Sequence, residues 1–218
     1  MTKHFGGFAA LRGVSESFLS GRMYALLGEN GAGKTTLLRS LAGLTRPSGG
    51  VIQLFGESNL RMIVHRLGYM AHPSLLYDEM TGMENLIYFS GLYGMKEDQR
   101  CRDVIRLVGL DPELARRVGQ YSQGMRQRLS LARAIVHDPE LLLLDEPFSN
   151  VDIASTRDMV RLLGTMRDQG KTIMIVTHQA SLLVGTADEY VSMHAGRVVG
   201  RTAHIPGSSS EMTRVGAR

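Results

Sequence analysis

The segment that most constrains the fold of this chain is a glycine-rich run, Gly28-Glu29-Asn30-Gly31-Ala32-Gly33-Lys34-Thr35-Thr36. An apolar, strand-like stretch precedes it and an apolar helical pattern follows it, so the run has the spacing and the flanks of a nucleotide phosphate loop. Its glycines let the backbone curl until successive N–H groups and a helix N-terminus point at a phosphate. We expect Lys34 to bridge the β- and γ-phosphates and the Thr35 hydroxyl to hold Mg²⁺. A glycine-rich turn without a ligand is the alternative, which the full pattern disfavours.

Two carboxylates follow a second apolar run. Leu141–Leu144 reads as a buried strand, and it delivers Asp145 and Glu146 to its carboxyl end, where parallel α/β sheets bind their ligands. We expect Asp145 to hold Mg²⁺ through its water shell and Glu146 to orient and deprotonate an attacking water. The alternative is a helix cap or a solvated turn. The run Thr172–Val176 places His178 at the same edge, where a γ-phosphate contact is favoured over a structural role.

Apolar runs that alternate with helical patterns predict a parallel sheet flanked by helices. The predicted strands are Met23–Leu27, Val51–Leu54, Leu141–Leu144 and Thr172–Val176. Between Thr81 and Arg117 the apolar positions follow a helical period, which indicates a helical insert between strands. From about Arg201 the sequence turns polar and small, which predicts a mobile tail.

Length and composition limit the classes of protein that remain. A chain of 218 residues with 43% hydrophobic and 21% charged residues suits one globular domain. Its longest apolar runs are strand-length and its N-terminus lacks the apolar core of a secretory signal, so we expect a cytosolic protein with at most peripheral membrane contact. A lone cysteine, Cys101, excludes an internal disulfide. The net charge of +4 is scattered, so no nucleic-acid partner is expected.

A further segment distinguishes among the many nucleotide hydrolases, the run Tyr121-Ser122-Gln123-Gly124-Met125-Arg126-Gln127-Arg128. It resembles the signature of ABC transporter ATP-binding subunits, whose consensus is Leu-Ser-Gly-Gly-Gln, in a form similar to that of exporters with a six-helix membrane subunit. The resemblance implies that Ser122, Gln123, Gly124 and the helix N-terminus bind the γ-phosphate of ATP held by a partner chain. An ordinary serine-capped helix is equally consistent, because capping is the physics by which such a site binds an anion.

The resemblance extends over nearly the whole chain in the family's order. It implies an α/β fold of the P-loop NTPase type, with a mainly parallel sheet, an N-terminal antiparallel β part and an inserted helical subdomain at about 81–137. One ATPase domain would span 1–200, and 201–218 would be a flexible tail. Phe5 would stack on adenine, although a core role is nearly as well supported. Asp152 would lie where two chains meet and couple their sites.

The same resemblance implies the activity and its partners. ATP and Mg²⁺ would be clamped between two copies, as a homodimer or a pseudo-symmetric dimer, and hydrolysis would drive an integral membrane permease at the cytoplasmic face of the inner membrane. Two alternatives from other classes are a soluble ABC ATPase acting on DNA or ribosomes and a small-molecule kinase. The chain lacks the second cassette or long coiled coil typical of the first, and the signature segment disfavours the second.

The chain departs from the family pattern at two places. Only Met1–His4 precede Phe5, where the family usually has a longer strand, so either that strand is shortened here or the protein starts upstream. At His72 the family normally has a glutamine that touches Mg²⁺ and the attacking water, and imidazole is a poorer partner for that hard cation. The haem exporters of cytochrome c maturation carry a histidine in this loop, so the chain resembles that branch. Another exporter of the same membrane type, for a drug, a lipid or a polysaccharide, is the alternative.

Overall fold

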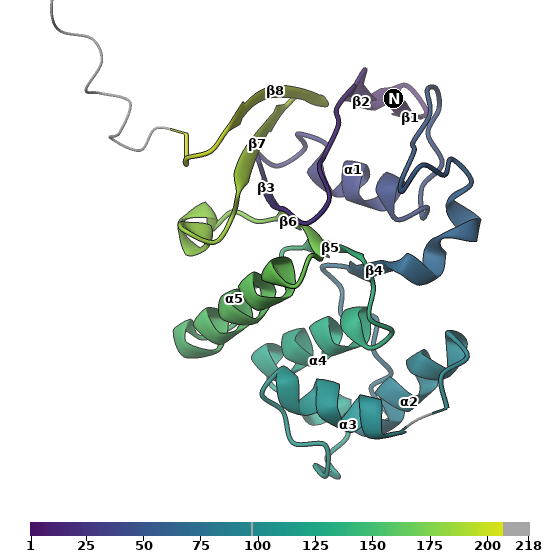
Figure 1. Ribbon diagram of the computed structural model, residues 1–218, viewed down its shortest axis with the longest axis vertical. Helices are drawn as coiled ribbons and strands as arrows, with labels where there is room; N and C mark the ends of the chain where they lie inside the picture. Colours follow the sequence, from purple (N-terminus) through teal and green to yellow (C-terminus); the bar gives the residue numbers. More distant parts are fainter. Residues whose placement is uncertain (97, 207–218) are drawn as a thin grey trace, which may run out of the picture.

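The computed structural model describes residues 1–96 and 98–206. Its centre is a six-stranded sheet of order β4-β5-β6-β3-β7-β8, beside a separate antiparallel pair, β1-β2 (Figure 1). The strands are β1 Thr2–Phe5, β2 Phe8–Arg12, β3 Met23–Leu27, β4 Leu67–Met70, β5 Leu141–Asp145, β6 Thr172–Val176, β7 Glu189–His194 and β8 Arg197–Thr202. The α-helices are α1 Lys34–Leu41, α2 Gly82–Leu92, α3 Asp98–Leu107, α4 Gln123–Ile135 and α5 Ile153–Asp168, with short 3-10 turns at Leu60–Met62, Val64–Arg66, Val118–Gln120 and Ala180–Leu183.

The central sheet is parallel from β4 to β7, and only β8 runs antiparallel. Every residue of β5 and β6 is buried, as continuous apolar runs require when helices cover both faces. Alternate residues of β3 point to opposite faces: Met23 and Ala25 join the core on the side of α4 and α5, whereas Tyr24 and Leu26 join the core beneath α1. The mainly parallel sheet and the antiparallel N-terminal pair confirm the predicted fold class.

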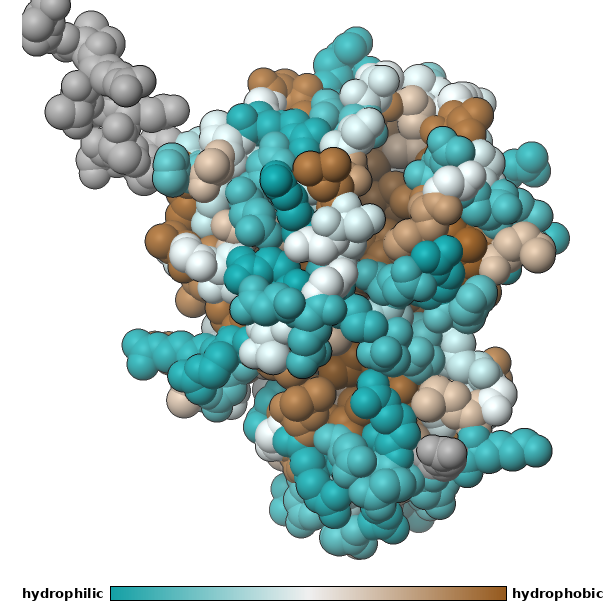
Figure 2. Space-filling view, in the orientation of Figure 1, coloured by the Kyte–Doolittle hydropathy of each residue, from teal (hydrophilic) through white to brown (hydrophobic). Residues whose placement is uncertain are grey.

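Helices α2, α3 and α4 pack on one another at the end of the molecule away from β1 and β2 (Figure 1). All three lie within residues 81–137, and α2 begins at a capping box formed by Thr81 and Glu84. Figure 2 shows hydrophilic side chains over much of one face, with hydrophobic ones at the narrowing between the sheet and these helices and also in the upper right of the view. None of the helices in residues 1–96 and 98–206 has the length and apolar character needed to cross a membrane.

One prediction about the backbone is wrong. Val51–Leu54 is not a strand: Phe55 turns the chain with a φ of 55°, Leu54 bridges only to Glu57 across that turn, and Val51 is 74% exposed. β-branched residues form a strand only where a neighbouring strand can pair with them. Strand β8 ends at Thr202, next to the start predicted for the tail at about 201, and the tail of 201–218 stays a prediction. Residues 207–218 of that range lie outside the described residues.

Candidate nucleotide site

Three neighbouring strands end at one edge of the sheet and bring the predicted residues together. Strand β3 runs into the phosphate loop, residues 28–33, while β5 ends at Asp145 and β6 leads to His178. Because the order is β5-β6-β3 and all three strands are parallel, their carboxyl ends lie side by side. This is the edge at which open α/β sheets bind ligands.

The side chain of Lys34 reaches back to the phosphate loop that precedes it. Gly33 caps α1 in the left-handed region with a φ of 99°, and a Cβ there would lie 2.6 Å from the Ala10 carbonyl oxygen, so only glycine fits. The Lys34 ammonium donates to the carbonyl oxygens of Gly28 at 2.6 Å and Glu29 at 3.0 Å. Burial lowers the pKa of Lys34, and the nearby Glu146 and Asp145 oppose that shift. Its cation is therefore held at the loop, where phosphate oxygens would replace the carbonyls.

Thr35 and Asp145 form the pair predicted to hold Mg²⁺. The Thr35 hydroxyl donates to Asp145 Oδ1 at 3.1 Å, and Asp145 is only 3% exposed. Burial raises the pKa of Asp145, while the Thr35 hydrogen bond lowers it. Two hard oxygen donors fit a Mg²⁺ ion that takes its other ligands from phosphate and water. Residues 1–96 and 98–206 contain no cluster of three His, Cys, Asp or Glu side chains that would form an all-protein cage instead.

Glu146 is held by its backbone and presents its carboxylate to the site. It has a φ of 51°, a strained conformation for a residue with a side chain. Its N–H donates to Val176 O and its C=O accepts from Gln127 Nε2, both at 2.9 Å. His178 donates its backbone N–H to Oε2 at 3.4 Å, and its ring Nε2 lies 3.4 Å from Oε1 without hydrogen-bond geometry.

The Oε1 atom of Glu146 is consequently buried with no hydrogen-bond partner among the described residues. Burial raises the pKa of Glu146, and His178 lowers it. A buried carboxylate oxygen with an unused acceptor position is what a general base needs, since a water molecule can donate to it.

A cleft of about 680 Å³ joins these groups, and its lining includes Lys34, Thr35, Asp145, Glu146, His178 and His72. The aromatic residue at its β1-β2 side is Phe8, which is 58% exposed. Phe5, predicted to stack on adenine, does not line the cleft; it is also exposed, with the Lys3 ammonium 4.7 Å from its ring centroid. Phe5 and Phe8 pair across the β1-β2 turn, and the side chain that lines the cleft is the one on β2.

Sequence reasoning missed four residues at this site: Phe8, Arg39, Tyr69 and Gln127. Arg39 lies one helical turn beyond Thr35, and a 3.6-residue period could have placed it. Tyr69 lies on β4, the neighbour of β5, and burial raises its pKa. No sequence signal pairs Gln127 with the backbone of Glu146.

The residues assigned to the signature and Asp152 lie outside this cleft. Ser122 caps α4 by accepting from the Met125 N–H at 3.2 Å, and Asp152 caps α5 by accepting from the Ser155 N–H at 2.9 Å, which lowers its pKa. A Cβ on Gly124 would lie 3.9 Å from Val151 Cα, so the starts of the two helices are adjacent. These residues, with Gln123, form a second exposed surface on the same chain.

Comparison with known proteins decides the family. A family model described as ABC transporter matches residues 11–149. The chain belongs to the ABC transporter family. Among its ABC relatives, the chain is 37% identical over 201 residues to the ATP-binding protein NatA of Bacillus subtilis, covering 89% of this chain and 82% of NatA. It is 35% identical to the bacitracin transport ATP-binding protein BcrA of Bacillus licheniformis, covering 91% of this chain and 66% of BcrA. It is 36% identical to the Nod factor export ATP-binding protein I of Burkholderia lata, covering 92% and 68%.

Solved ABC structures have the same fold. An ATP-binding subunit of an ABC transporter superposes with a TM-score of 0.83 at 26% identity, covering 93% of this chain and 87% of that one. A dimeric cassette in a post-hydrolysis state with ADP and Pi has a TM-score of 0.84 at 23% identity, covering 93% and 94%. The chain is thus an ABC transporter ATP-binding subunit and an ATPase. None of the relatives named above is named for haem.

Proposed function

We propose that this ABC ATP-binding subunit hydrolyses MgATP as a dimer and so drives export through a separate integral membrane subunit. The observation that supports this most directly is the Glu146 carboxylate: Glu146 lines the cleft that contains the phosphate loop, and its buried Oε1 has no hydrogen-bond partner among the described residues. A carboxylate in that position takes a proton from water as the water attacks the γ-phosphate.

Each residue of the cleft has a distinct task in this mechanism. Lys34 stabilises the negative charge that develops on the γ-phosphate, and His178 contacts the same phosphate from β6. Thr35 and Asp145 hold Mg²⁺, which when bound neutralises the phosphate charge. Glu146, which lines the cleft, accepts the proton of the attacking water.

His72 lines the cleft at the position where the family has glutamine. It follows β4 by two residues, and β4 pairs with β5, the strand that ends at Asp145, so the two residues lie at the same edge of the sheet. We assign His72 to contact with the attacking water rather than to metal binding, because Mg²⁺ prefers oxygen ligands to imidazole.

The separation of the two surfaces supports the proposed dimer. Ser122, Gln123 and Gly124 do not line the cleft of their own chain, so their contact with a γ-phosphate requires a second copy. In a head-to-tail pair each cleft would be closed by the partner's signature, with Asp152 at the junction. The similarity to a cassette solved as a dimer supports this arrangement.

The membrane subunit and its cargo are less constrained. The BcrA and Nod factor relatives are named for transport and export. A sulfate/thiosulfate import protein of Methylococcus capsulatus is 38% identical over 210 residues. The direction of transport is therefore part of the proposal. His72 favours haem export for cytochrome c biogenesis. The bacitracin and Nod factor relatives favour the alternative, another drug, lipid or polysaccharide exporter. In either case the chain would bind the cytoplasmic face of the inner membrane peripherally.

The test is a pull-down of the tagged Glu146→Gln chain with ATP from solubilised membranes of its own cells. Recovery of a six-helix membrane protein with small haem-handling proteins supports haem export. Recovery of a different permease supports the alternative cargo. Ribosomes or DNA without any membrane protein would contradict the transporter assignment.

The presence of Phe8 in the cleft lining gives a separate prediction. Phe8→Ala is expected to raise the dissociation constant for ATP about tenfold, because stacking of a base on an aromatic ring contributes about 1–3 kcal/mol. Phe5→Ala is the matched control and should change it less than about twofold. Titration with a fluorescent ATP analogue measures both, and a larger loss in Phe5→Ala would assign the stacking role to Phe5 instead.

A further inference from the structure

The turn between β7 and β8 is bonded directly to the nucleotide site. Gly196 donates its N–H to the Ala32 carbonyl of the phosphate loop at 3.0 Å and accepts from the Arg12 N–H of β2 at 2.8 Å. Its φ is +79°, and a Cβ there would lie 2.7 Å from the Ala10 carbonyl oxygen, which excludes other residues. A single glycine therefore joins β2, the phosphate loop and the hairpin.

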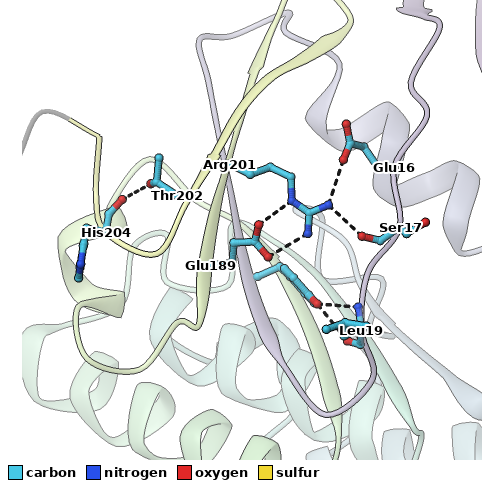
Figure 3. Close-up of polar contacts among 8 residues, drawn as sticks. Glu16, Ser17, Leu19, Glu189, Arg201, Thr202 and His204 are labelled. Carbon is cyan, nitrogen blue, oxygen red and sulfur yellow. Dashed lines mark hydrogen bonds and ion pairs between the residues drawn. The ribbon is translucent and has the colours of Figure 1, made fainter.

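The other end of this hairpin is held by Arg201, as Figure 3 shows. Its guanidinium donates to both oxygens of Glu189 at 2.6 and 2.9 Å, and to Glu16 at 3.0 Å and the Ser17 carbonyl at 2.9 Å. The Phe18 ring centroid lies 5.0 Å from the same group. Glu189 and Glu16 side chains are only 18% and 22% exposed, so these are partly desolvated, charge-assisted contacts.

The hydrogen bonds of Gly196 and the contacts of Arg201 hold the same stretch of chain, from β2 to the segment before β3. Glu16 and Ser17 lie between β2 and β3, and β3 leads into the phosphate loop. Strand β2 contributes Phe8 and Ala10 to the cleft, yet in the described part of the chain its only strand partner is β1, outside the central sheet. Leu11 of β2 packs on α1 in the core, Gly196 bonds β2 to the phosphate loop, and Arg201 holds the segment that follows β2, so the hairpin adds two attachments to this cleft wall beyond its core packing.

We propose that Arg201 is a positioning residue of the nucleotide site, which through the β7–β8 hairpin fixes the β2 wall of the cleft relative to the phosphate loop. It acts on the affinity for a nucleoside triphosphate and not on the hydrolytic step, because its contacts are with Glu16, Ser17 and Glu189 and not with Asp145 or Glu146. The inference rests on ATP binding at this cleft.

The test compares Arg201→Gln with the wild-type chain. Its dissociation constant for a fluorescent ATP analogue is expected to rise about three- to tenfold, as for other residues that couple to a site through a contact network. The hydrolysis rate at saturating ATP should change less than twofold. Arg197→Gln is the matched control: this arginine is exposed on the same strand and has no ion pair within residues 1–96 and 98–206, so affinity should be unchanged.

A wild-type dissociation constant in folded Arg201→Gln, or an equal rise in Arg197→Gln, overturns the proposal. If Arg201→Gln does not fold, Glu16→Gln decides, because it leaves the Arg201–Glu189 pair of the hairpin in place: weaker ATP binding supports the proposal and wild-type binding overturns it. Failure of the wild-type chain to bind ATP would instead contradict the nucleotide site itself, which separates the two hypotheses.

Discussion

The Glu146→Gln chain is expected to bind ATP normally and to hydrolyse it about 10²- to 10⁴-fold more slowly than the wild type. Glutamine preserves the shape of the side chain, and its amide oxygen can still accept from the His178 N–H. The group that replaces Oε1 cannot take a proton from water. In the wild-type chain, Oε1 is the carboxylate oxygen that has no hydrogen-bond partner among the described residues. Phosphate release under single-turnover conditions measures the hydrolytic step, and titration with a fluorescent ATP analogue measures binding.

Glu140→Gln is the matched control for this experiment. Glu140 immediately precedes β5, so it lies at the opposite end of the strand that delivers Glu146. Its carboxylate pairs with Arg66 at 2.6 Å on the surface, where a substitution has little effect, and hydrolysis should stay within about twofold of wild type. If Glu146→Gln hydrolyses ATP at the rate of Glu140→Gln, Glu146 is not the base.

The parts of the site that the sequence predicted are those fixed by local structure. A glycine-rich run between a strand and a helix closes on itself, so Lys34 and Thr35 follow from the pattern alone. A continuous apolar run predicts a strand that is buried on both faces, as β5 is. The two acids that end the run therefore lie at the carboxyl end of that strand, as Asp145 and Glu146 do.

The parts that the sequence did not predict depend on pairing between distant segments. Which of Phe5 and Phe8 reaches the cleft is set by the register of β1 and β2, which shifts between Lys3 and His4. Arg201 and Glu16 are separated by 185 positions, so the polar end of the chain gave no sign that it would form a paired strand. The failed strand at Val51–Leu54 has the same origin, since propensity cannot supply a partner strand.

Lys34→Ala is expected to raise the dissociation constant for ATP about 100-fold, because it removes the charge-assisted contact of its ammonium to the phosphates, and such a contact is worth about 1.5–3 kcal/mol. Lys34 is 6% exposed, and the carbonyl oxygens that its ammonium contacts belong to the phosphate loop itself. Lys171→Ala is the matched control: Lys171 immediately precedes β6, at the opposite end of that strand from His178, and pairs with Asp138 at 2.9 Å. Fluorescent-analogue titration should give the control a wild-type constant.

Thermal unfolding separates loss of binding from loss of folding in Lys34→Ala. ATP at 100 times the wild-type dissociation constant stabilises the wild-type chain by about 2.7 kcal/mol, whereas a 100-fold weaker site gains only about 0.4 kcal/mol. The variant should therefore unfold cooperatively without ATP and respond little when ATP is added, while the Lys171→Ala control responds fully. A full response to ATP in Lys34→Ala would mean that the backbone N–H groups of residues 28–33 bind the phosphates without the lysine, and the charge neutralisation assigned to Lys34 would then have to come from Mg²⁺ and His178.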